Sequence, residues 1–140
     1  MEDRVESRVA GRARATGGSA DMVAHVVLFR PRPDLTAADA SLLVEAFDRA
    51  LRGIPSIRRA RVGRRIAIGA QYEQLPQPDL TFAAVLEFDD KAGLTAYLEH
   101  PAHAGIGQRF FASSEATLVF DFEMESSADG LRALLDERRT

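Results

Sequence analysis

Four segments of the chain show the hydrophobic spacing of β-strands. In residues 22–30, His25, Val27 and Phe29 share one face, and the opposite face is also apolar. A strand that is apolar on both faces is typically buried on both sides. The other three segments are residues 57–68, with a bend expected at Gly63, residues 80–88 and residues 116–124.

Between these segments the spacing changes to that of helices. Leu43, Phe47 and Leu51 repeat every four residues behind Thr36, whose position resembles a capping box, and Gly53 ends this first helix. A second helix is predicted to start at Asp89 or Asp90 and to carry Leu94, Tyr97 and Leu98 on one face. Pro101 disfavours helical geometry at His100 and can open a further helix, so a corner between two helices is expected there.

The predicted order βαββαβ indicates an α+β fold of the ferredoxin-like class. In this fold a four-stranded antiparallel sheet carries its helices on one face. The strand at 22–30 is apolar on the other face too, so a second copy is expected to cover it through two-fold symmetry. The sequence therefore predicts a homodimer.

The two ends of the chain differ from this core. Residues 1–21 combine arginines with Ala, Gly and Ser and show no apolar periodicity, so a disordered N-terminal tail is expected. Residues 22–124 form the predicted domain. Residues 125–140 form a C-terminal extension in which Ser126 or Ser127 can cap a short helix bearing Leu131, Leu134 and Leu135.

Composition narrows the class of protein. The 140 residues suit one domain, and 46% of them are hydrophobic, enough for a core. The chain has no cysteine, so neither disulfides nor thiolate metal sites are expected. It has no apolar run of the ~20 residues that cross a membrane and no signal peptide, so a cytoplasmic protein that binds no membrane is predicted. An arginine cluster at 58–65 has no interleaved aromatic residues, which argues against nucleic-acid binding.

Candidate chemistry concentrates at residues 97–107, which hold Tyr97, His100 and His103. Each has a plain structural interpretation: Tyr97 as a core residue, His100 as a turn residue and His103 as a surface residue. His25, on the first strand, fits a hydrogen-bonded core histidine. A metal site at His100 and His103 is not expected, because Pro101 disturbs their geometry and no third ligand stands at a recognisable spacing.

Several motifs resemble the stress-responsive α/β-barrel family, known as Dabb. The stretch Y-x-x-H-P-A-H-x-G-x-G from Tyr97 to Gly107 follows a strand ending Leu-Glu-Phe, and the first strand contains H-x-V-L-F-R. The resemblance covers residues 22–124. It implies the ferredoxin-like fold and a dimer whose two sheets close into a barrel.

The resemblance also implies roles, because cyclase members of the family place their catalytic groups at the positions of His25, Tyr97 and His103. His103 would be the general base, Tyr97 would donate to the carbonyl or enolate oxygen, and His25 would help to orient the substrate or share that polarising role. His100 is a secondary candidate. The reaction would be an aldol-type closure of a poly-β-ketone, which needs no cofactor and no metal, in an apolar pocket lined by Val27, Phe29, Leu43, Phe47 and Ile106.

Two other classes of function stay open at this level. One is a non-catalytic, stress-related dimeric barrel that binds a hydrophobic small molecule. The other is oxidative, since related dimeric barrels include haem-dependent and cofactor-free monooxygenases, and His100 or His103 could serve as an axial ligand.

Overall fold

The computed structural model describes residues 22–137, so the predicted N-terminal tail lies outside the described residues. Four strands form one antiparallel sheet in the order β3-β4-β2-β5. Their bounds are β2 Met22–Pro31, β3 Arg59–Arg64, β4 Phe82–Phe88 and β5 Ser114–Met124. The helices are α1 Ala37–Gly53, α2 Lys91–Glu99, α3 Pro101–Ser113 and α4 Ala128–Glu137, with a short 3-10 turn η1 at Gln71–Gln74.

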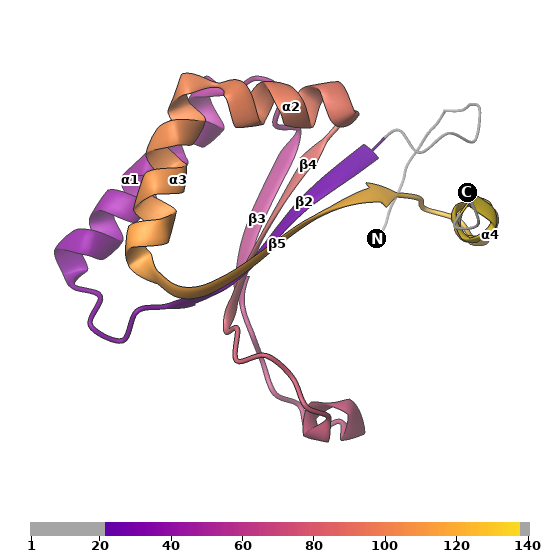
Figure 1. The fold of residues 1–140 in the computed structure, drawn as a ribbon, viewed down its shortest axis with the longest axis horizontal. Coiled ribbons are helices and arrows are strands. Elements are labelled where there is room, and N and C mark those ends of the chain that lie inside the picture. The colour runs from indigo at the N-terminus through magenta and orange to yellow at the C-terminus, as the bar shows by residue number, and fades with distance from the viewer. Residues whose placement is uncertain (1–21, 138–140) are drawn as a thin grey trace.

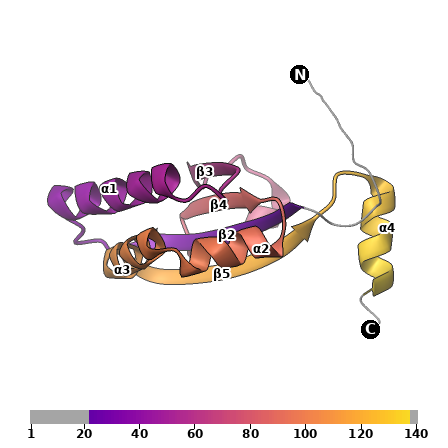
Figure 2. The same cartoon turned by 90° about the horizontal axis from the view of Figure 1, so that it is seen from above.

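Helices α1, α2 and α3 cover one face of the sheet (Figure 1). Seen from above, α1 lies over the β3 and β4 side, while α2 and α3 follow one another along the β2 and β5 side (Figure 2). This is the predicted ferredoxin-like arrangement. Within residues 22–137, no helix covers the opposite face of the sheet, here called the open face (Figure 1).

Local signals fix where the helices begin and end. Thr36 Oγ1 accepts from the Asp39 N–H at 3.0 Å and the Asp39 carboxylate accepts from the Thr36 N–H, so the predicted capping box is present. Asp90 caps α2 by accepting from the Gly93 N–H at 2.8 Å. The chain then breaks at His100 and restarts at Pro101, so the predicted helix–helix corner is confirmed.

The core lies between the helices and the sheet. Phe88 and Ile54 are fully buried, and Ala46 and Ala50 let α1 approach the sheet closely. Leu98 was predicted on the buried face of α2, but it is 43% exposed, because the face that points at the sheet carries Leu94 and Tyr97.

The open face carries exposed apolar side chains, most of them on β5. Register places Val85, Val26 and Phe120 in one row across β4, β2 and β5. Leu118, Phe120, Phe122 and Met124 of β5 are all at least 40% exposed there. Exposed apolar area of this extent usually marks an interaction surface. At the other edge the rows end in Arg59 and Arg61 of β3.

The expected long second strand is shorter than predicted, since β3 ends at Arg64 and not at Ile68. The backbone N–H groups of Ile68 and Gly69 donate to the Glu73 carboxylate at 2.7 and 3.0 Å instead of pairing in the sheet. Gly69 has φ +80°, a conformation that favours glycine and turns the chain. Residues 66–80 therefore leave the sheet as a separate arm, which projects below it (Figure 1), while the Arg65 N–H still donates to the Thr81 oxygen at its base.

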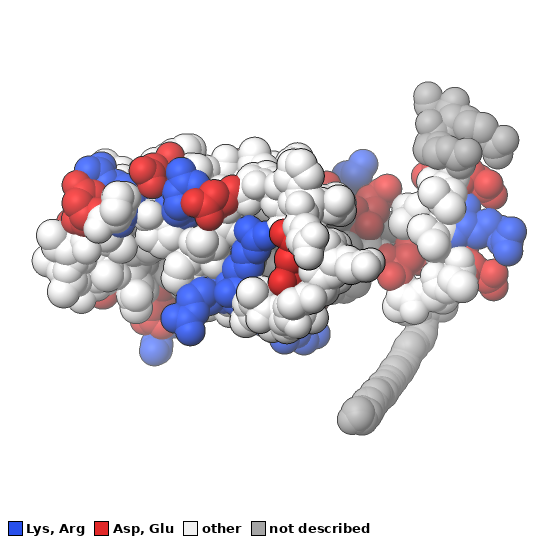
Figure 3. Space-filling view, turned by 90° about the horizontal axis from the view of Figure 1, so that it is seen from below, with Lys and Arg blue, Asp and Glu red and all other residues white. Residues whose placement is uncertain are grey.

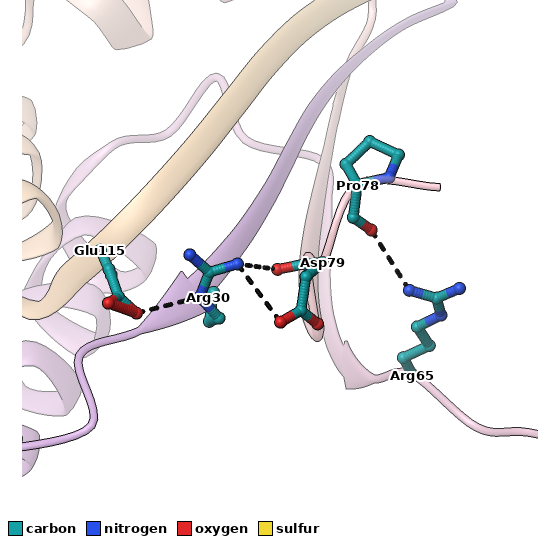
Figure 4. Close-up of polar contacts among 5 residues, drawn as sticks. All are labelled: Arg30, Arg65, Pro78, Asp79 and Glu115. Carbon is teal, nitrogen blue, oxygen red and sulfur yellow. Dashed lines mark hydrogen bonds and ion pairs between the residues drawn. The ribbon is translucent and has the colours of Figure 1, made fainter. Parts of the chain in front are cut away.

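Two arginines hold the returning end of this arm. Arg30 of β2 donates to the backbone oxygen of Asp79, approaches the Asp79 carboxylate at 3.5 Å and pairs with Glu115 at 3.0 Å (Figure 4). Arg65 donates to the Pro78 oxygen at 3.4 Å. The base of the arm is thereby linked to β2 and β5.

Helix α4 follows β5 and lies beyond its end, apart from the other helices (Figures 1 and 2). Ser127 Oγ accepts from the Gly130 N–H at 2.9 Å and so caps the start of the helix. Leu131, on the apolar side of α4, is 56% exposed. Within residues 22–137, no helix has the length and apolar character needed to cross a membrane.

Candidate acid–base site

Three aromatic side chains, one each from β2, α2 and α3, lie next to one another between the helices and the sheet. The ring of Tyr97 on α2 lies 5.5 Å from the ring of His25 on β2 and 4.8 Å from the ring of His103 on α3, measured between centroids. Both contacts are edge-on, at 62° and 70° between planes. The structure therefore brings together the three residues that the sequence singled out, with Tyr97 in the middle.

Burial differs along the series. His25 and Tyr97 are 6% and 5% exposed, and His103 is half-buried. Phe88 packs against the other side of Tyr97 at 5.3 Å between ring centroids. The tyrosine ring is thus held in the core, while His103 lies where the cluster approaches solvent.

His25 is oriented by a carboxylate from the neighbouring strand. Asp121 of β5 stands directly opposite His25 in the sheet register, and its Oδ1 lies 2.6 Å from His25 Nδ1. An ionised carboxylate can only accept, so His25 Nδ1–H donates to Asp121, and Nε2 is the ring nitrogen that this contact does not engage. The Asp121 side chain is 45% exposed on the edge strand, so this pair joins the buried ring to the molecular surface.

Burial shifts the pKa of the other two groups in directions useful for proton transfer. Desolvation raises the pKa of Tyr97 to about 12, so its hydroxyl stays protonated and can donate at neutral pH. Desolvation, and secondarily the positive charge of protonated His25, lower the pKa of His103 from its ordinary 6.5. The His103 imidazole is therefore neutral at pH 7 and can accept a proton.

His100 does not join the cluster as a free group. Its Nδ1 accepts from the Ala102 N–H at 3.0 Å, which makes it the N-cap of α3, and its backbone N–H donates to the backbone carbonyl oxygen of Tyr97 at 3.2 Å. This geometry explains His100 as the residue that forms the corner between α2 and α3. It places Tyr97 and His103 on either side of one bend.

The residues predicted to line a pocket lie on the helix-covered side of the sheet. Phe29 contacts Phe82 and Phe110 at 5.5 and 4.8 Å between centroids, Phe47 packs against the core, and Ile106 is buried in it. Val27 and Leu43 are half-buried. An apolar substrate pocket formed by these five residues stays a prediction.

A hollow of about 590 Å³ lies elsewhere, between the arm and the sheet. None of the five predicted lining residues borders it. Its walls include Leu28 of β2, Tyr72 of η1 and Phe82 of β4. The charged residues that line it are Arg64, Arg65 and Glu73. Among residues 22–137, no three His, Cys, Asp or Glu side chains lie together as a metal site would require.

Comparison with known families identifies the chain. The model of the Stress responsive A/B Barrel Domain, Dabb, matches residues 23–124. The chain belongs to the Dabb family. The match covers all four strands and helices α1 to α3, and α4 follows it. No curated protein matches the chain.

Solved structures share the fold at low sequence identity. A Dabb family protein with a ferredoxin-like fold from Mesorhizobium loti is 23% identical, with TM-score 0.58, and the alignment covers 75% of this chain and 98% of that one. A dimeric ferredoxin-like protein of unknown function from Jannaschia sp. is 26% identical, with TM-score 0.56 and coverage of 74% and 99%. A hydroxynitrile lyase from Passiflora edulis is 15% identical, with TM-score 0.65 and coverage of 78% and 98%.

Asp121 is the site residue that the sequence analysis did not single out. In residues 116–124, alternation places Leu118, Phe120 and Phe122 on one face, and these apolar residues are what predict the strand. Asp121 falls on the other face, which the helices cover. A carboxylate at that position could have indicated a polar partner on the same side of the sheet. A charged side chain at a helix-facing strand position needs a partner. Here that partner is His25.

Proposed function

We propose that this Dabb protein catalyses aldol-type chemistry on a β-carbonyl compound, with His103 as general base and Tyr97 as proton donor. The observation that carries the proposal is the contact of Tyr97 with both histidines, in a core position where one histidine is oriented by Asp121. A base, an acid and an oriented second imidazole are the parts that such a reaction needs.

His103 is the best placed base of the three. It is neutral at pH 7 because its pKa is lowered, and it is more exposed than His25. His25, in contrast, already donates through Nδ1 to Asp121. A substrate carbon between two carbonyl groups is acidic enough for an imidazole to deprotonate, and His103 would take that proton.

Tyr97 would act on the oxygen where negative charge develops. A phenol with a pKa of about 12 remains a hydrogen-bond donor through the whole neutral range. His25 would contribute through Nε2, which the Asp121 contact leaves free for the substrate. Asp121 is then a positioning residue, since it acts through His25.

The proposed steps balance without an external oxidant or metal. His103 removes a proton from the activated carbon, giving an enolate. The enolate carbon attacks a second carbonyl carbon of the same chain, one carbon–carbon bond forms, and the electron pair of the attacked carbonyl moves to its oxygen. Tyr97 protonates that alkoxide, and the proton on His103 returns to the tyrosine oxygen.

One structural comparison supports the proposed chemistry, and others support a dimer. One protein that shares the fold is named a hydroxynitrile lyase, so the fold accommodates a lyase that acts on a hydroxynitrile. Other proteins of the fold are described as dimeric. We infer that this chain is also a homodimer, because a second copy would bury the exposed Phe120 and Phe122 of the open face.

The test supplies the purified protein with linear poly-β-ketone thioesters and follows ring closure by mass and ultraviolet absorbance. We expect turnover by the parent and a loss of about 10²-fold or more in His103→Gln. The matched control is His100→Asn, which alters a histidine outside the cluster and keeps a capping side chain. Equal rates for the parent and His103→Gln across the substrate series would overturn the proposal.

A second candidate function is favoured by the hollow beside the arm. Its volume of about 590 Å³ lies in the range of small-molecule sites, and Leu28, Ile68 and Phe82 give it apolar walls. A non-catalytic barrel that binds a hydrophobic small molecule would use it. Saturable binding of an apolar fluorescent probe that Leu28→Glu abolishes and His103→Gln leaves unchanged is the expected result for this function.

A further inference from the structure

Exposed apolar side chains surround the hollow between the arm and the sheet. Ile66, Ile68 and Tyr72 line it from the side of the arm, and they are 77%, 68% and 58% exposed. Leu28 of β2 and Phe82 of β4 line it from the sheet. Large apolar side chains gathered around one concave surface indicate a ligand that covers them.

Positive charge borders the same hollow, since Arg64 and Arg65 also line it. Within residues 22–137, the Arg64 side chain has neither an ion pair nor a hydrogen bond. Arg65 donates to two uncharged groups, the Pro78 oxygen (Figure 4) and Gln77 Oε1, and has no ion pair in the described part of the chain. Figure 3 views the molecule from below, the side on which the arm projects, and shows basic side chains gathered near the middle.

Among the residues that line the hollow, Glu73 alone is acidic, and its carboxylate is already engaged. The two oxygens accept from the backbone N–H groups of Ile68 and Gly69 at 2.7 and 3.0 Å. The hydrogen bond from Ile68 is the largest cause that lowers the pKa of Glu73, so this carboxylate is ionised at neutral pH. Two guanidinium groups therefore accompany one carboxylate, which leaves the hollow with a surplus of positive charge.

Arg65 and the apolar wall of the sheet belong to the same side of the sheet. The Arg65 N–H donates to the Thr81 oxygen at 2.8 Å, so the pairing with the neighbouring strand continues one residue beyond β3. Alternation then places Arg65 on the side of Gly63, which lies in one row with Leu28. Arg64 lines the hollow from the outer edge of the sheet, because β3 is an edge strand.

We propose that the hollow binds an apolar chain that ends in a carboxylate, with Arg64 and Arg65 binding the carboxylate. This inference rests on the second candidate function, the binding of a hydrophobic small molecule, and adds the charge of the ligand. The chain would cover Leu28, Ile68 and Tyr72, which are otherwise in contact with water. A guanidinium group binds a carboxylate through two parallel hydrogen bonds, which are stronger than those between neutral groups.

Displacement of an apolar fluorescent probe can compare ligands that share one chain and differ in the head group. The ligands are dodecanoate, dodecanol and dodecylammonium, added to the full chain below the concentrations at which they form micelles. We expect the dissociation constant of dodecanoate to be at least about tenfold lower than that of dodecanol, because charged hydrogen bonds are added. Dodecylammonium should bind more weakly than dodecanol, because its charge is repelled by the arginines.

Two arginines of β3 give a matched pair of variants. Arg64→Gln removes a guanidinium group that lines the hollow and makes no hydrogen bond within residues 22–137, so the arm keeps its own contacts. This variant should bind dodecanoate at least about threefold more weakly and dodecanol unchanged. The control is Arg61→Gln, which removes the same charge from an exposed residue of β3 that does not line the hollow. It should leave both dissociation constants unchanged.

The outcomes separate the charge of the ligand from the function on which it rests. Equal dissociation constants for dodecanoate and dodecanol would overturn the inference and leave the binding of hydrophobic molecules standing. Tightest binding of dodecylammonium would overturn it in the same way. Equal losses in Arg64→Gln and Arg61→Gln would contradict the place assigned to the carboxylate. A parent that binds neither the probe nor any of these ligands would remove both the inference and the second candidate function.

A second copy of the chain is the other possible occupant of the apolar walls, and Ile68→Glu distinguishes it. A charge at this lining residue should abolish the binding of dodecanoate and leave the sedimentation of the protein unchanged, measured by analytical ultracentrifugation. Loss of binding together with dissociation of a dimeric parent would mean that the hollow is a contact between copies, which would overturn the inference.

Discussion

Tyr97 meets His103 edge-on across the corner between α2 and α3, with ring centroids 4.8 Å apart. They lie six positions apart in sequence, and His100 halfway between them caps α3. The packing of the ring and the chemistry of the hydroxyl belong to different atoms of Tyr97. Substitutions can therefore separate its structural role from its catalytic one.

Replacing Tyr97 with Phe should keep the ring contacts with Phe88 and the histidines and remove the hydroxyl. We expect the free energy of unfolding to change by less than about 1 kcal/mol, because no ring packing is lost. Turnover of a poly-β-ketone should fall by about 10²-fold or more, since the donor to the developing alkoxide is gone. Tyr72→Phe on the exposed arm is the control, and both properties should match those of the parent.

The high pKa of Tyr97 predicts a late ionisation step. Titration of tyrosinate absorbance should show a component with a midpoint of about 12 that Tyr97→Phe removes. Since the pKa of this acid is higher in the folded chain than its ordinary 10.0, burial of the neutral phenol stabilises the fold below pH 10. That stabilisation is lost as the pH rises toward 12. A spectrum with no such component would show that Tyr97 is hydrated.

For His103 the pH dependence of stability has the opposite sign to that for Tyr97, because the lowered pKa means that the fold favours the neutral imidazole. The unfolded chain binds this proton near the ordinary value of 6.5, and the folded chain binds it only at lower pH. Stability is therefore unaffected by His103 above the ordinary value and decreases as the pH falls below it. Nuclear magnetic resonance titration of the His103 ring should give a midpoint below 6.5.

The control for this titration is His25→Gln, which removes the second cause of the shift. The midpoint of His103 should move upward in that variant but stay below the ordinary value, because burial is the larger cause. A His103 midpoint at or above 6.5 in the parent would contradict the assignment of His103 as a desolvated base.

Asp121→Asn tests whether the carboxylate orients His25. An amide can present an oxygen to the same Nδ1–H, but it lacks the charge that favours this tautomer and can equally present its NH₂ group. We expect kcat to fall by about tenfold or more with little change in KM, because Asp121 would act through His25 and not on the substrate. Glu123→Gln, on the same face of β5, is the control for the loss of one negative charge.

The same pair shows why the sequence predicted the fold better than the site. The alternation of apolar residues predicted strands close to the observed Met22–Pro31 and Ser114–Met124, because such a pattern is local to each strand. The contact between His25 and Asp121 joins positions 96 residues apart in sequence and depends on register, which no single strand encodes. Tyr97 and His103 were found because both flank one helix break.

The arm was missed for a related reason. Ile66 and Ile68 continue the apolar alternation of β3, so residues 57–68 predicted one long strand. The Glu73 carboxylate instead accepts from the Ile68 and Gly69 N–H groups, and Gly69 turns the chain at φ +80°. Hydrogen bonding to a side chain five residues ahead therefore outweighed the hydrophobic pattern, which left Ile68 68% exposed.

The cap of α1 gives a prediction about stability that is independent of any catalytic role. Thr36→Ala removes the oxygen that accepts from the Asp39 N–H at 3.0 Å. The reciprocal contact, from the backbone N–H of residue 36 to the Asp39 carboxylate, is then no longer supported by it. Such a substitution should cost about 1 kcal/mol of unfolding free energy, measured by urea denaturation at fixed protein concentration. Thr36→Ser keeps the hydroxyl and should cost much less. Equal losses in the two variants would mean that the threonine methyl group, and not the hydrogen bond, stabilises the start of the helix.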